Sequence, residues 1–475
     1  MSKLINRYFE RLRQLEYAIL IDISGDRRRD VAGTEIVPIL DRLASLLGRM
    51  GIHPGDRVVA IVDNTLEAAL LLLAAMRHGI TLCLQPADAS AADIEKAARL
   101  VEAKFTVNAT GKTVGNTEAW RLDDLPAVEK VPVDVRAGTP FTVTFTSGST
   151  GTPKGIVHAA ESFLTCADAF NKQTDITNED RFLNVMPMYY MAGIFNGILA
   201  PLQAGAAVVI DSAFSTGTAL KFWRTVAENE ISALWLSPTM LSLATKLDRG
   251  NKQLPKAFRR LFVGTGAMLK SDAEAFEAMY GLAPLQSYGL SELLYVSVDD
   301  AEAPCFGTVG CPLEGVEIAS DDSGTLAIKT PYAFLGYLED GRVSTPQQPF
   351  VTSDIASFDD NRLSILGRSD DVILRGGVNV NPFEEEAYLS PLFSQRSFCL
   401  IGLPDAILGQ KVILVLEGAH RPQEAEILVE AQRLMRKKGG RVQIDGIAYV
   451  ATFPIGPTGK IRRKDIREML ARETI

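Results

Sequence analysis

The sequence predicts an α/β protein: a large N-terminal domain of helix-covered parallel sheets plus a small antiparallel β unit, followed by a smaller α+β C-terminal domain. Up to about Asp300, short apolar, β-branched runs alternate with longer helical patterns, as in parallel strands joined by crossover helices. Beyond Asp300 the runs are shorter and turn residues separate them, which is typical of antiparallel strands. From Asp370 to the end there is a segment of ~100 residues, the size of a domain.

The alternation is clearest between residues 57 and 263. Residues 57–62 are expected to form a strand, and residues 66–78 the helix that follows it. Further strands are expected at 206–210, 232–236 and 260–263. Further helices are expected at 217–229 and from Pro238 onward. Residues 191–210 carry no charge and are long enough to cross a membrane. Because Gly193, Pro201 and Gly205 interrupt this stretch, a buried helix, a turn at Gly205 and a strand are expected instead.

The C-terminal part has a different pattern of predicted elements. Short strands separated by turns are expected at 316–319, 324–329 and 363–366. Beyond them, strands are expected at 397–401 and 411–416, with a helix at 423–438. We therefore divide the chain into an N-terminal domain, residues 1–369, and a C-terminal domain, residues 370–475.

Composition excludes several classes of protein. The 475 residues carry a net charge of −9, and an acidic chain gains little from counterion release on nucleic acid. The five cysteines include no Cys-x-x-Cys pair and the four histidines stand far apart, so a zinc site or a disulfide scaffold is disfavoured. The N-terminus is charged and has no long apolar core, unlike a signal peptide. A cytoplasmic protein without a membrane span is expected, and the oligomeric state stays open.

The strongest local signal is a run of small and hydroxylated residues that ends in a lysine. It follows the β-branched run 141–145, so it is expected to leave a strand and to precede a helix. Small residues let the backbone approach phosphate oxygens, and the lysine adds a cation. A flexible linker is the alternative, but the embedded Pro-Lys-Gly disfavours it. The run comprises Thr146, Ser147, Gly148, Ser149, Thr150, Gly151, Thr152, Pro153, Lys154 and Gly155.

This run resembles the phosphate loop of the acyl-adenylate-forming superfamily: AMP-forming acyl-CoA synthetases, adenylation domains and luciferases. Five further motifs of that family have counterparts here in the same chain order, from about Ile36 to the end. They lie at 262–267 (Phe-Val-Gly-Thr-Gly-Ala), 287–292 (Ser-Tyr-Gly-Leu-Ser-Glu), 352–354 (Thr-Ser-Asp), 367–377 (with Pro382 and Glu384 after it) and 457–461 (Pro-Thr-Gly-Lys-Ile).

The resemblance implies that ATP and Mg²⁺ bind here and assigns a role to each matched residue. Tyr288 would lie against adenine, Ser291 would donate to the α-phosphate, and Glu292 would hold the Mg²⁺ ion. Asp354 would accept from the ribose hydroxyls, with Arg368 as its partner cation. The remaining nucleotide contacts would come from the phosphate loop and from Gly266, Ala267, Ser287 and Gly289. Without the ordered motifs, Glu292 and Asp354 would pass for solvent-exposed loop carboxylates.

Lys460 is the main catalytic candidate, together with Ser291 and Glu292. A carboxylate that attacks the α-phosphate brings two anions together, so a preorganised cation between them lowers the barrier. In the resembling family the C-terminal domain is mobile and turns between two steps about the position of Asp370. The strand with Gly376 and Gly377 would then enter, because a pantetheine arm must pass close to bare backbone.

The acyl pocket is expected to be mostly apolar or aromatic. Its lining would include Tyr189, Tyr190, Gly193, Trp235, Gly264 and Leu290. No acidic residue occurs between Arg181 and Asp211, and an unpaired buried ammonium would be costly, so a fatty, aryl or small apolar acid is preferred over an α-amino acid. Either tyrosine taken singly could equally be a core residue. Tyr190 also departs from the family, in which many members have histidine.

The sequence therefore predicts a ligase that adenylates a carboxylic acid with ATP, releases pyrophosphate, and passes the acyl group to CoA. The alternative acceptor is the phosphopantetheine arm of an acyl carrier protein. A third hypothesis, from another class, is a non-catalytic nucleotide-binding protein that retains the fold.

Overall fold

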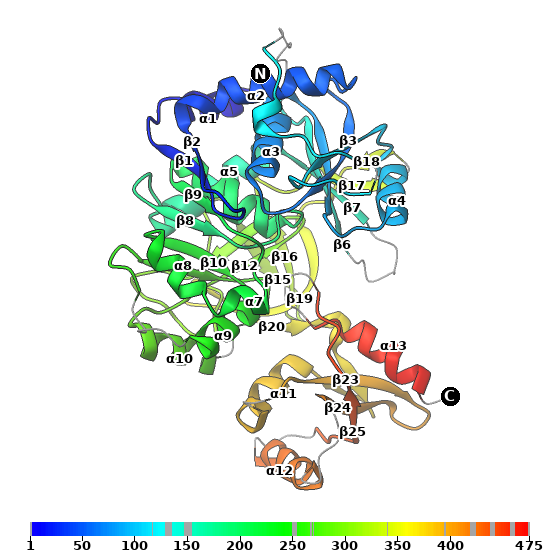
Figure 1. The fold of residues 1–475 in the computed structure, drawn as a ribbon. Helices are drawn as coiled ribbons and strands as arrows, with labels where there is room; N and C mark the ends of the chain where they lie inside the picture. Colours follow the sequence, from blue (N-terminus) through cyan, green and yellow to red (C-terminus); the bar gives the residue numbers. More distant parts are fainter. Residues whose placement is uncertain are drawn as a thin grey trace. The chain divides into compact units, whose positions relative to one another are not determined.

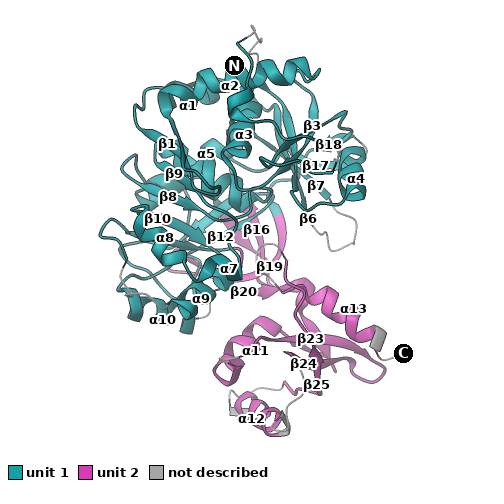
Figure 2. Ribbon diagram, in the orientation of Figure 1, with its two compact units in different colours: residues 1–264, 270–317, 329–350 teal, residues 265–269, 318–328, 351–475 magenta. Residues whose placement is uncertain are grey.

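The structure is a computed structural model that divides into two compact units, shown in Figure 2. Unit 1 comprises residues 1–264, 270–317 and 329–350, and unit 2 comprises residues 265–269, 318–328 and 351–475. The predicted boundary between residues 369 and 370 separates a domain that would move, whereas the two units are compact parts of one structure. That boundary therefore stays a prediction. The residues described are 2–115, 117–128, 135–146, 154–248, 254–266, 268, 270–339, 341–393, 396–418, 424–437, 442–456 and 461–473.

The first sheet of unit 1 has nine strands among the described residues, in the order β14-β13-β12-β11-β10-β8-β9-β1-β2. Its centre, from β12 to β1, is parallel, and both edges are antiparallel. The central strands are almost wholly buried, as expected for parallel strands covered on both faces. The strands are β1 Ala18–Asp22, β2 Arg29–Ala32, β8 Arg181–Asn184, β9 Ala207–Ile210, β10 Ala233–Leu236, β11 Arg260–Val263, β12 Leu285–Leu290, β13 Leu294–Val298 and β14 Cys311–Pro312.

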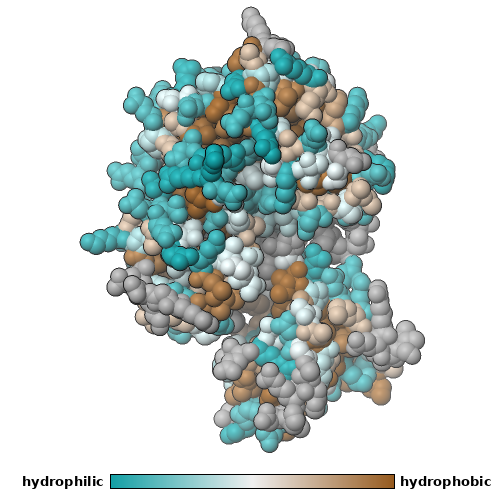
Figure 3. Space-filling view, viewed as in Figure 1, coloured by the Kyte–Doolittle hydropathy of each residue, from teal (hydrophilic) through white to brown (hydrophobic). Residues whose placement is uncertain are grey.

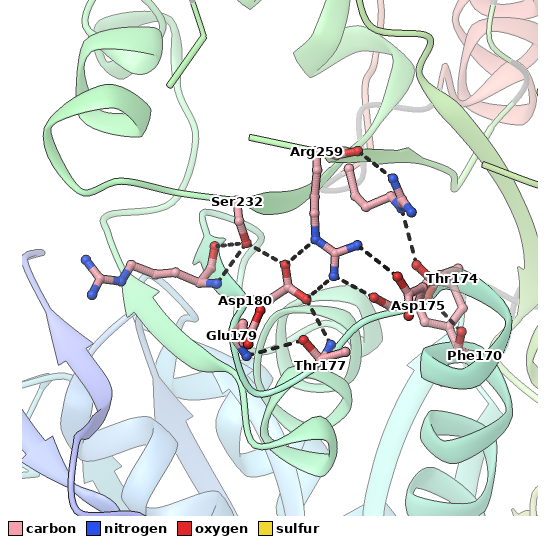
Figure 4. A network of polar contacts seen from close by, with 10 residues as sticks. Phe170, Thr174, Asp175, Thr177, Glu179, Asp180, Ser232 and Arg259 are labelled. Atoms are coloured by element: carbon pink, nitrogen blue, oxygen red, sulfur yellow. Dashed lines mark hydrogen bonds and ion pairs between the residues drawn. The ribbon is translucent and has the colours of Figure 1, made fainter. Parts of the chain in front are cut away.

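A polar network joins the amino ends of three of these parallel strands (Figure 4). Asp180 precedes β8, Ser232 precedes β10 and Arg259 precedes β11. The Asp180 carboxylate accepts from Arg259 Nε at 2.9 Å and from Ser232 Oγ at 2.7 Å. Because Asp180 is buried, pairing with a guanidinium and a hydroxyl offsets much of its desolvation cost. The network holds β8, β10 and β11 in register at one end, which fixes where their carboxyl ends lie.

The second sheet of unit 1 has the order β18-β17-β7-β6-β4-β3-β5 among the described residues. Strands β17 and β18 come from residues far along the chain, yet β17 pairs antiparallel with β7. The strands are β3 Arg57–Val62, β4 Thr81–Pro86, β5 Phe105–Ala109, β6 Pro140–Thr146, β7 Lys154–Ala159, β17 Gly336–Glu339 and β18 Arg342–Ser344.

Helices cover the sheets of unit 1 (Figure 1). In α3, twelve of thirteen side chains are buried; it begins at an N-cap threonine that accepts from Ala68 and ends at Gly79, which has φ +70°. The helices of unit 1 are α1 Lys3–Leu12, α2 Gly33–Arg49, α3 Leu66–His78, α4 Ala91–Val101, α5 Ala160–Thr174, the π-helix Ala192–Leu199, α6 Ala200–Ala204, α7 Thr216–Ala219, α8 Phe222–Glu228, α9 Pro238–Leu247 and α10 Lys270–Tyr280, with a 3₁₀ turn at Leu122–Asp124.

Among its described residues, unit 2 contains two sheets, with the orders β15-β16-β19-β20 and β22-β21-β24-β23, the latter extended by β25 beside β24. Apolar residues of β23 and β24 pack on both faces of the second sheet, so it is the core of this unit. Its elements are β15 Glu317–Ser320, β16 Thr325–Lys329, β19 Phe350–Asp359, β20 Arg362–Arg368, β21 Ile373–Arg375, β22 Val378–Val380, β23 Phe398–Asp405, β24 Gly409–Glu417, β25 Gly446–Val450, α11 Pro382–Leu389, α12 Glu424–Lys437 and α13 Arg463–Glu473, with 3₁₀ turns at Ser369–Asp371 and Ser390–Phe393.

The predicted fold class is confirmed, and several elements differ from expectation. Strand β7 follows the phosphate-loop residues, where a helix was expected. The expected helix 217–229 is two short helices, α7 and α8. Antiparallel pairing begins before Asp300, because β12 and β13 already form a hairpin. Hairpins need only a tight turn, so they can extend a parallel sheet at its edges.

No helix in the described part of the chain is long and apolar enough to cross a membrane. The uncharged stretch 191–210 is instead the π-helix, α6, a left-handed Gly205 with φ +84°, and β9. On the face of unit 1 visible in Figure 3, hydrophilic side chains surround small apolar areas.

Candidate functional site

The carboxyl ends of the parallel strands β8, β10, β11 and β12 meet at one edge of the first sheet. In open α/β sheets, ligands bind beyond this edge. The segments that leave it begin after Asn184, Leu236 and Val263. All three segments were predicted to line the acyl pocket.

Gly264 lies where these segments crowd together. A Cβ at this position would be 2.5 Å from Trp235 Cζ2 and 2.8 Å from Ser287 Oγ, so only glycine fits without displacing its neighbours. Trp235 Nε1 donates to Ser287 Oγ at 3.3 Å, and both residues are buried. The structure therefore brings three predicted site residues into direct contact.

Tyr189, Tyr190 and Gly193 lie at the start of the π-helix, where Gly193 N donates to Tyr190 O at 3.0 Å. A Cβ at Gly193 would be 2.2 Å from Pro187 O. The two backbone segments are therefore too close for any side chain at position 193. The ring centroids of Tyr189 and Tyr190 are 5.2 Å apart in an edge-to-face contact, a favourable aromatic geometry. Single-turn π-bulges are frequent at functional sites, and this longer π segment also lies at the predicted pocket.

Burial raises the pKa of Tyr189 to about 12, and the charges of the neighbouring Tyr190, Asp88 and Asp63 contribute to this shift. Asp63 and Asp88 act on Tyr189 electrostatically and lie outside the segment between Arg181 and Asp211 in the sequence. Acidic residues from elsewhere in the sequence therefore influence this part of the predicted pocket. The preference for an apolar acid stays a prediction.

The residues from Ser287 to Glu292 form the end of β12 and the turn into β13. The pairing register of β12 and β13 shifts between Tyr288 and Gly289, and a Cβ at Gly289 would be 2.2 Å from Leu294 O. This bulge changes the direction of β12. The strand then ends at Leu290. Ser291 and Glu292 follow in the turn and are partly exposed.

The Glu292 side chain is held by a tyrosine that the sequence analysis did not single out. Tyr337 Oη donates to Glu292 Oε1 at 2.9 Å. The ring of the same tyrosine lies 5.0 Å from Lys154 Nζ, within the range of a cation–π contact. The predicted metal carboxylate and the predicted phosphate-binding lysine therefore share one neighbour.

His158, on β7, is a second residue that the sequence analysis missed. Its Nε2 lies 2.7 Å from Ser291 O, and its ring is 5.2 Å from that of Phe163. Burial lowers the pKa of His158 to about 4, although the bond to Ser291 opposes this shift. A neutral ring beside a carbonyl must carry its proton on Nε2, which then donates to Ser291 O. His158 thus supports the backbone of the Ser291–Glu292 turn.

Because its pKa is lower in the folded protein, His158 should make stability depend on pH. Between pH 6.5 and pH 4 the unfolded chain binds the extra proton, so stability is lost as the pH falls. The shift corresponds to about 3 kcal/mol at full effect. Urea unfolding of the full chain across this range should show a steeper loss of stability for the wild type than for His158→Gln. The exposed His53→Gln control should keep the wild-type slope, and equal slopes in all three proteins would contradict the assignment.

In unit 2, Asp354 and Arg368 face each other on the paired strands β19 and β20. Arg368 Nε lies 3.6 Å from Asp354 Oδ1, and Arg368 Nη2 donates to Ser353 Oγ at 2.6 Å. Asp354 is buried, whereas Arg368 and Asp370 are exposed. Arg368 and Asp354 therefore form an ion pair, and their roles in binding ribose stay predictions. Gly266 also belongs to unit 2.

Gly376 and Gly377 form the turn between β21 and β22. Their φ angles are +56° and +80°, which glycine adopts at little cost. Gly376 N donates to Leu408 O at 2.8 Å, and a Cβ at Gly377 would meet no atom of the residues that the structure describes within 4 Å. Gly377 is therefore open on its side-chain face, as the predicted path of a thiol arm requires. The roles of Asp370 as a hinge and of these glycines stay predictions.

Three parts of the predicted site lie outside the described residues. They are the phosphate-loop residues 147–153, Ala267 and Lys460. Thr146 and Lys154 flank the first of these and are paired at the ends of β6 and β7.

Comparison with known proteins identifies related chains. A family model described as "AMP-binding enzyme" matches residues 35–338. The chain is 26% identical over 478 residues to the 3-[(3aS,4S,7aS)-7a-methyl-1,5-dioxo-octahydro-1H-inden-4-yl]propanoyl:CoA ligase of Rhodococcus jostii (strain RHA1), covering 90% of this chain and 91% of that protein.

Two further similarities extend over almost the whole chain. The chain is 26% identical to the medium/long-chain-fatty-acid–[acyl-carrier-protein] ligase FadD10 of Mycobacterium tuberculosis (strain ATCC 25618 / H37Rv), covering 98% of this chain and 95% of that protein. Its fold is similar to that of ATP-bound MatB from Rhodopseudomonas palustris, with a TM-score of 0.83, 21% identity and 98% of both chains covered.

Proposed function

We propose, from the premise that this chain belongs to the AMP-binding enzyme family, that its described site activates a carboxylic acid with ATP. The resemblance to acyl-adenylate-forming enzymes is confirmed, and the chain is an AMP-forming acid–thiol ligase. Its substrates are ATP, a carboxylic acid, and CoA or a carrier-bound thiol. A cytoplasmic location stays a prediction from the sequence.

One observation carries the assignment of the site. Lys154 and Glu292, which lie 138 positions apart in the sequence, both contact Tyr337. A cation over the ring and a carboxylate at the hydroxyl of one tyrosine suit a metal–triphosphate, because the lysine attracts phosphate oxygens and the carboxylate attracts the metal. Ser291, next to Glu292, adds a hydroxyl that can donate to the same phosphate.

The Glu292 carboxylate fits Mg²⁺. Among the described residues, Tyr337 is its hydrogen-bond partner and occupies Oε1, so Oε2 can coordinate a cation. The described residues include no cluster of three or more histidine, cysteine or acidic side chains able to hold a metal. Mg²⁺ bound with nucleotides commonly takes one or two carboxylates and completes its shell with phosphate oxygens and water. When bound, the ion would offset charge on the phosphates.

The remaining residues would act on the acid and the nucleotide. Trp235, Gly264 and the two tyrosines would line the acyl pocket, and Tyr288 would lie against adenine. Asp354 would accept from ribose hydroxyls. Lys460 would neutralise the charge that develops as the carboxylate attacks the α-phosphate, forming acyl-AMP and releasing pyrophosphate.

We propose free CoA as the acceptor, with a fatty, aryl or small apolar acid as the substrate. The CoA ligase of Rhodococcus supports CoA, whereas FadD10 supports a carrier protein as the alternative. The open face of Gly377 suits a pantetheine arm in either case.

Pyrophosphate exchange is the direct test. The protein, Mg²⁺ and ATP should incorporate labelled pyrophosphate into ATP only when a suitable acid is present, in a panel of graded fatty acids, aryl acids and amino acids. With the best acid, free CoA should be acylated, and a phosphopantetheinylated carrier protein supplied in its place should not. If none of the acids in the panel supports pyrophosphate exchange, the proposed activity is contradicted. If only the carrier protein is acylated, the choice of acceptor is reversed.

A further inference from the structure

We propose that Tyr337 is a positioning residue that orients the Glu292 carboxylate toward the metal–triphosphate through its hydroxyl and holds Lys154 over its ring. The inference rests on the proposed function of this site and adds a residue that lies outside the motifs described above. It follows from contacts within unit 1.

The strand pairing explains how Tyr337 reaches both partners. In the β7–β17 ladder, Tyr337 lies opposite Ile156. Lys154 is two residues from Ile156 on the same strand, so it lies on the same face as Tyr337 and diagonal to it. From this place the ring approaches the Lys154 ammonium, and the hydroxyl extends to Glu292.

Glu292 is held at two points by the same segment of chain. Its carbonyl oxygen accepts from Phe334 N at 2.8 Å, and its carboxylate accepts from Tyr337 Oη. The rings of Phe334 and Tyr337 are in edge-to-face contact with centroids 4.9 Å apart. The segment from Phe334 to Tyr337 therefore fixes both the backbone and the side chain of Glu292.

The phenol suits this task because it stays a donor. A phenol hydroxyl carries one proton to donate, and here it donates that proton's hydrogen bond to Glu292 Oε1. A carboxylate with one oxygen held loses little rotamer freedom when it binds a cation, and preorganisation of this kind raises affinity.

The test separates the hydroxyl from the ring. Tyr337→Phe removes only the hydrogen bond to Glu292, whereas Tyr337→Leu also removes the aromatic face below Lys154. The matched control is Tyr17→Phe, which removes a tyrosine hydrogen bond of 2.8 Å to Gly205 O elsewhere in unit 1. The melting temperature of each variant shows whether it is folded.

Two readouts are measured. Paramagnetic relaxation by Mn²⁺ with ATP reports metal binding without turnover, and Mg²⁺ titration of pyrophosphate exchange reports adenylation. Tyr337→Phe should weaken metal binding by about 10-fold, the scale for losing a hydrogen bond to a charged group, and excess Mg²⁺ should restore its rate. Tyr337→Leu should in addition weaken ATP binding by roughly 2–5-fold. Transfer from supplied acyl-AMP to the thiol should be unchanged, because it uses neither metal nor pyrophosphate.

The outcomes distinguish this inference from the proposed function. If the wild type binds Mn²⁺ with ATP and the folded Phe variant binds it equally well, the positioning role is wrong. A Phe variant that loses both half-reactions in proportion to a lowered melting temperature would also overturn it, since that pattern indicates a structural role. If the wild type exchanges no pyrophosphate with any acid, the proposed activity fails, while the Mn²⁺ measurement still decides the role of Tyr337.

Discussion

Replacing Lys460 by alanine is expected to slow adenylation by ~10²–10³, the scale for removing one preorganised charge-stabilising group. The substrates of this step are two anions, and the ammonium would neutralise the charge that builds up between them. Transfer of the acyl group from supplied acyl-AMP to the thiol should keep its rate. Single-turnover kinetics of the two half-reactions measure both effects.

Lys464→Ala is the matched control for this prediction. Lys464 lies four residues later, in α13, and is exposed. Its removal should change neither half-reaction. Equal losses in both half-reactions for Lys460→Ala would contradict the idea that this lysine serves only the first step and then leaves.

Replacing Glu292 by glutamine is the second change with a large expected effect. Glutamine keeps the size of the side chain and can still accept from Tyr337 Oη, but it loses the charge that would hold Mg²⁺. Adenylation should fall by ~10²–10³, and the Mg²⁺ concentration for half-maximal rate should rise. The rate of pyrophosphate exchange as a function of Mg²⁺ checks both expectations.

Glu314→Gln serves as the control, because Glu314 is exposed and pairs with Lys172 at the surface. Its exchange rate and Mg²⁺ dependence should match those of the wild type. An unchanged Mg²⁺ profile in Glu292→Gln would show that another group holds the metal.

Local patterns predicted much of the central fold. The strand Arg57–Val62, the helix Leu66–His78 and the strand Arg260–Val263 have the predicted bounds, since each is an uninterrupted apolar run or periodic segment with clear ends. The strand Lys154–Ala159 was missed, because a short apolar run is compatible with either a strand or the start of a helix.

The same limit applies to the site. The motifs predicted Trp235, Gly264 and Ser287 separately, and the structure brings all three into contact. Tyr337 and His158 were missed because their importance depends on which strand lies beside β7 and on which turn lies over it. Such long-range pairings leave no signal in a short sequence window.

The pairing of β7 with β17 also determines how the protein can be divided. Along the sequence, residues 318–328 belong to unit 2, and the chain then returns to unit 1 with residues 329–350. A fragment that stops at residue 330 would lack β17 and β18, leaving the β7 backbone as an uncovered edge open to intermolecular pairing and aggregation. A fragment must therefore extend to residue 350 to contain all of unit 1, and it then also carries residues 265–269 and 318–328 of unit 2. Circular permutation or chain fusion would have to keep residues 318–350 continuous with the rest of the chain.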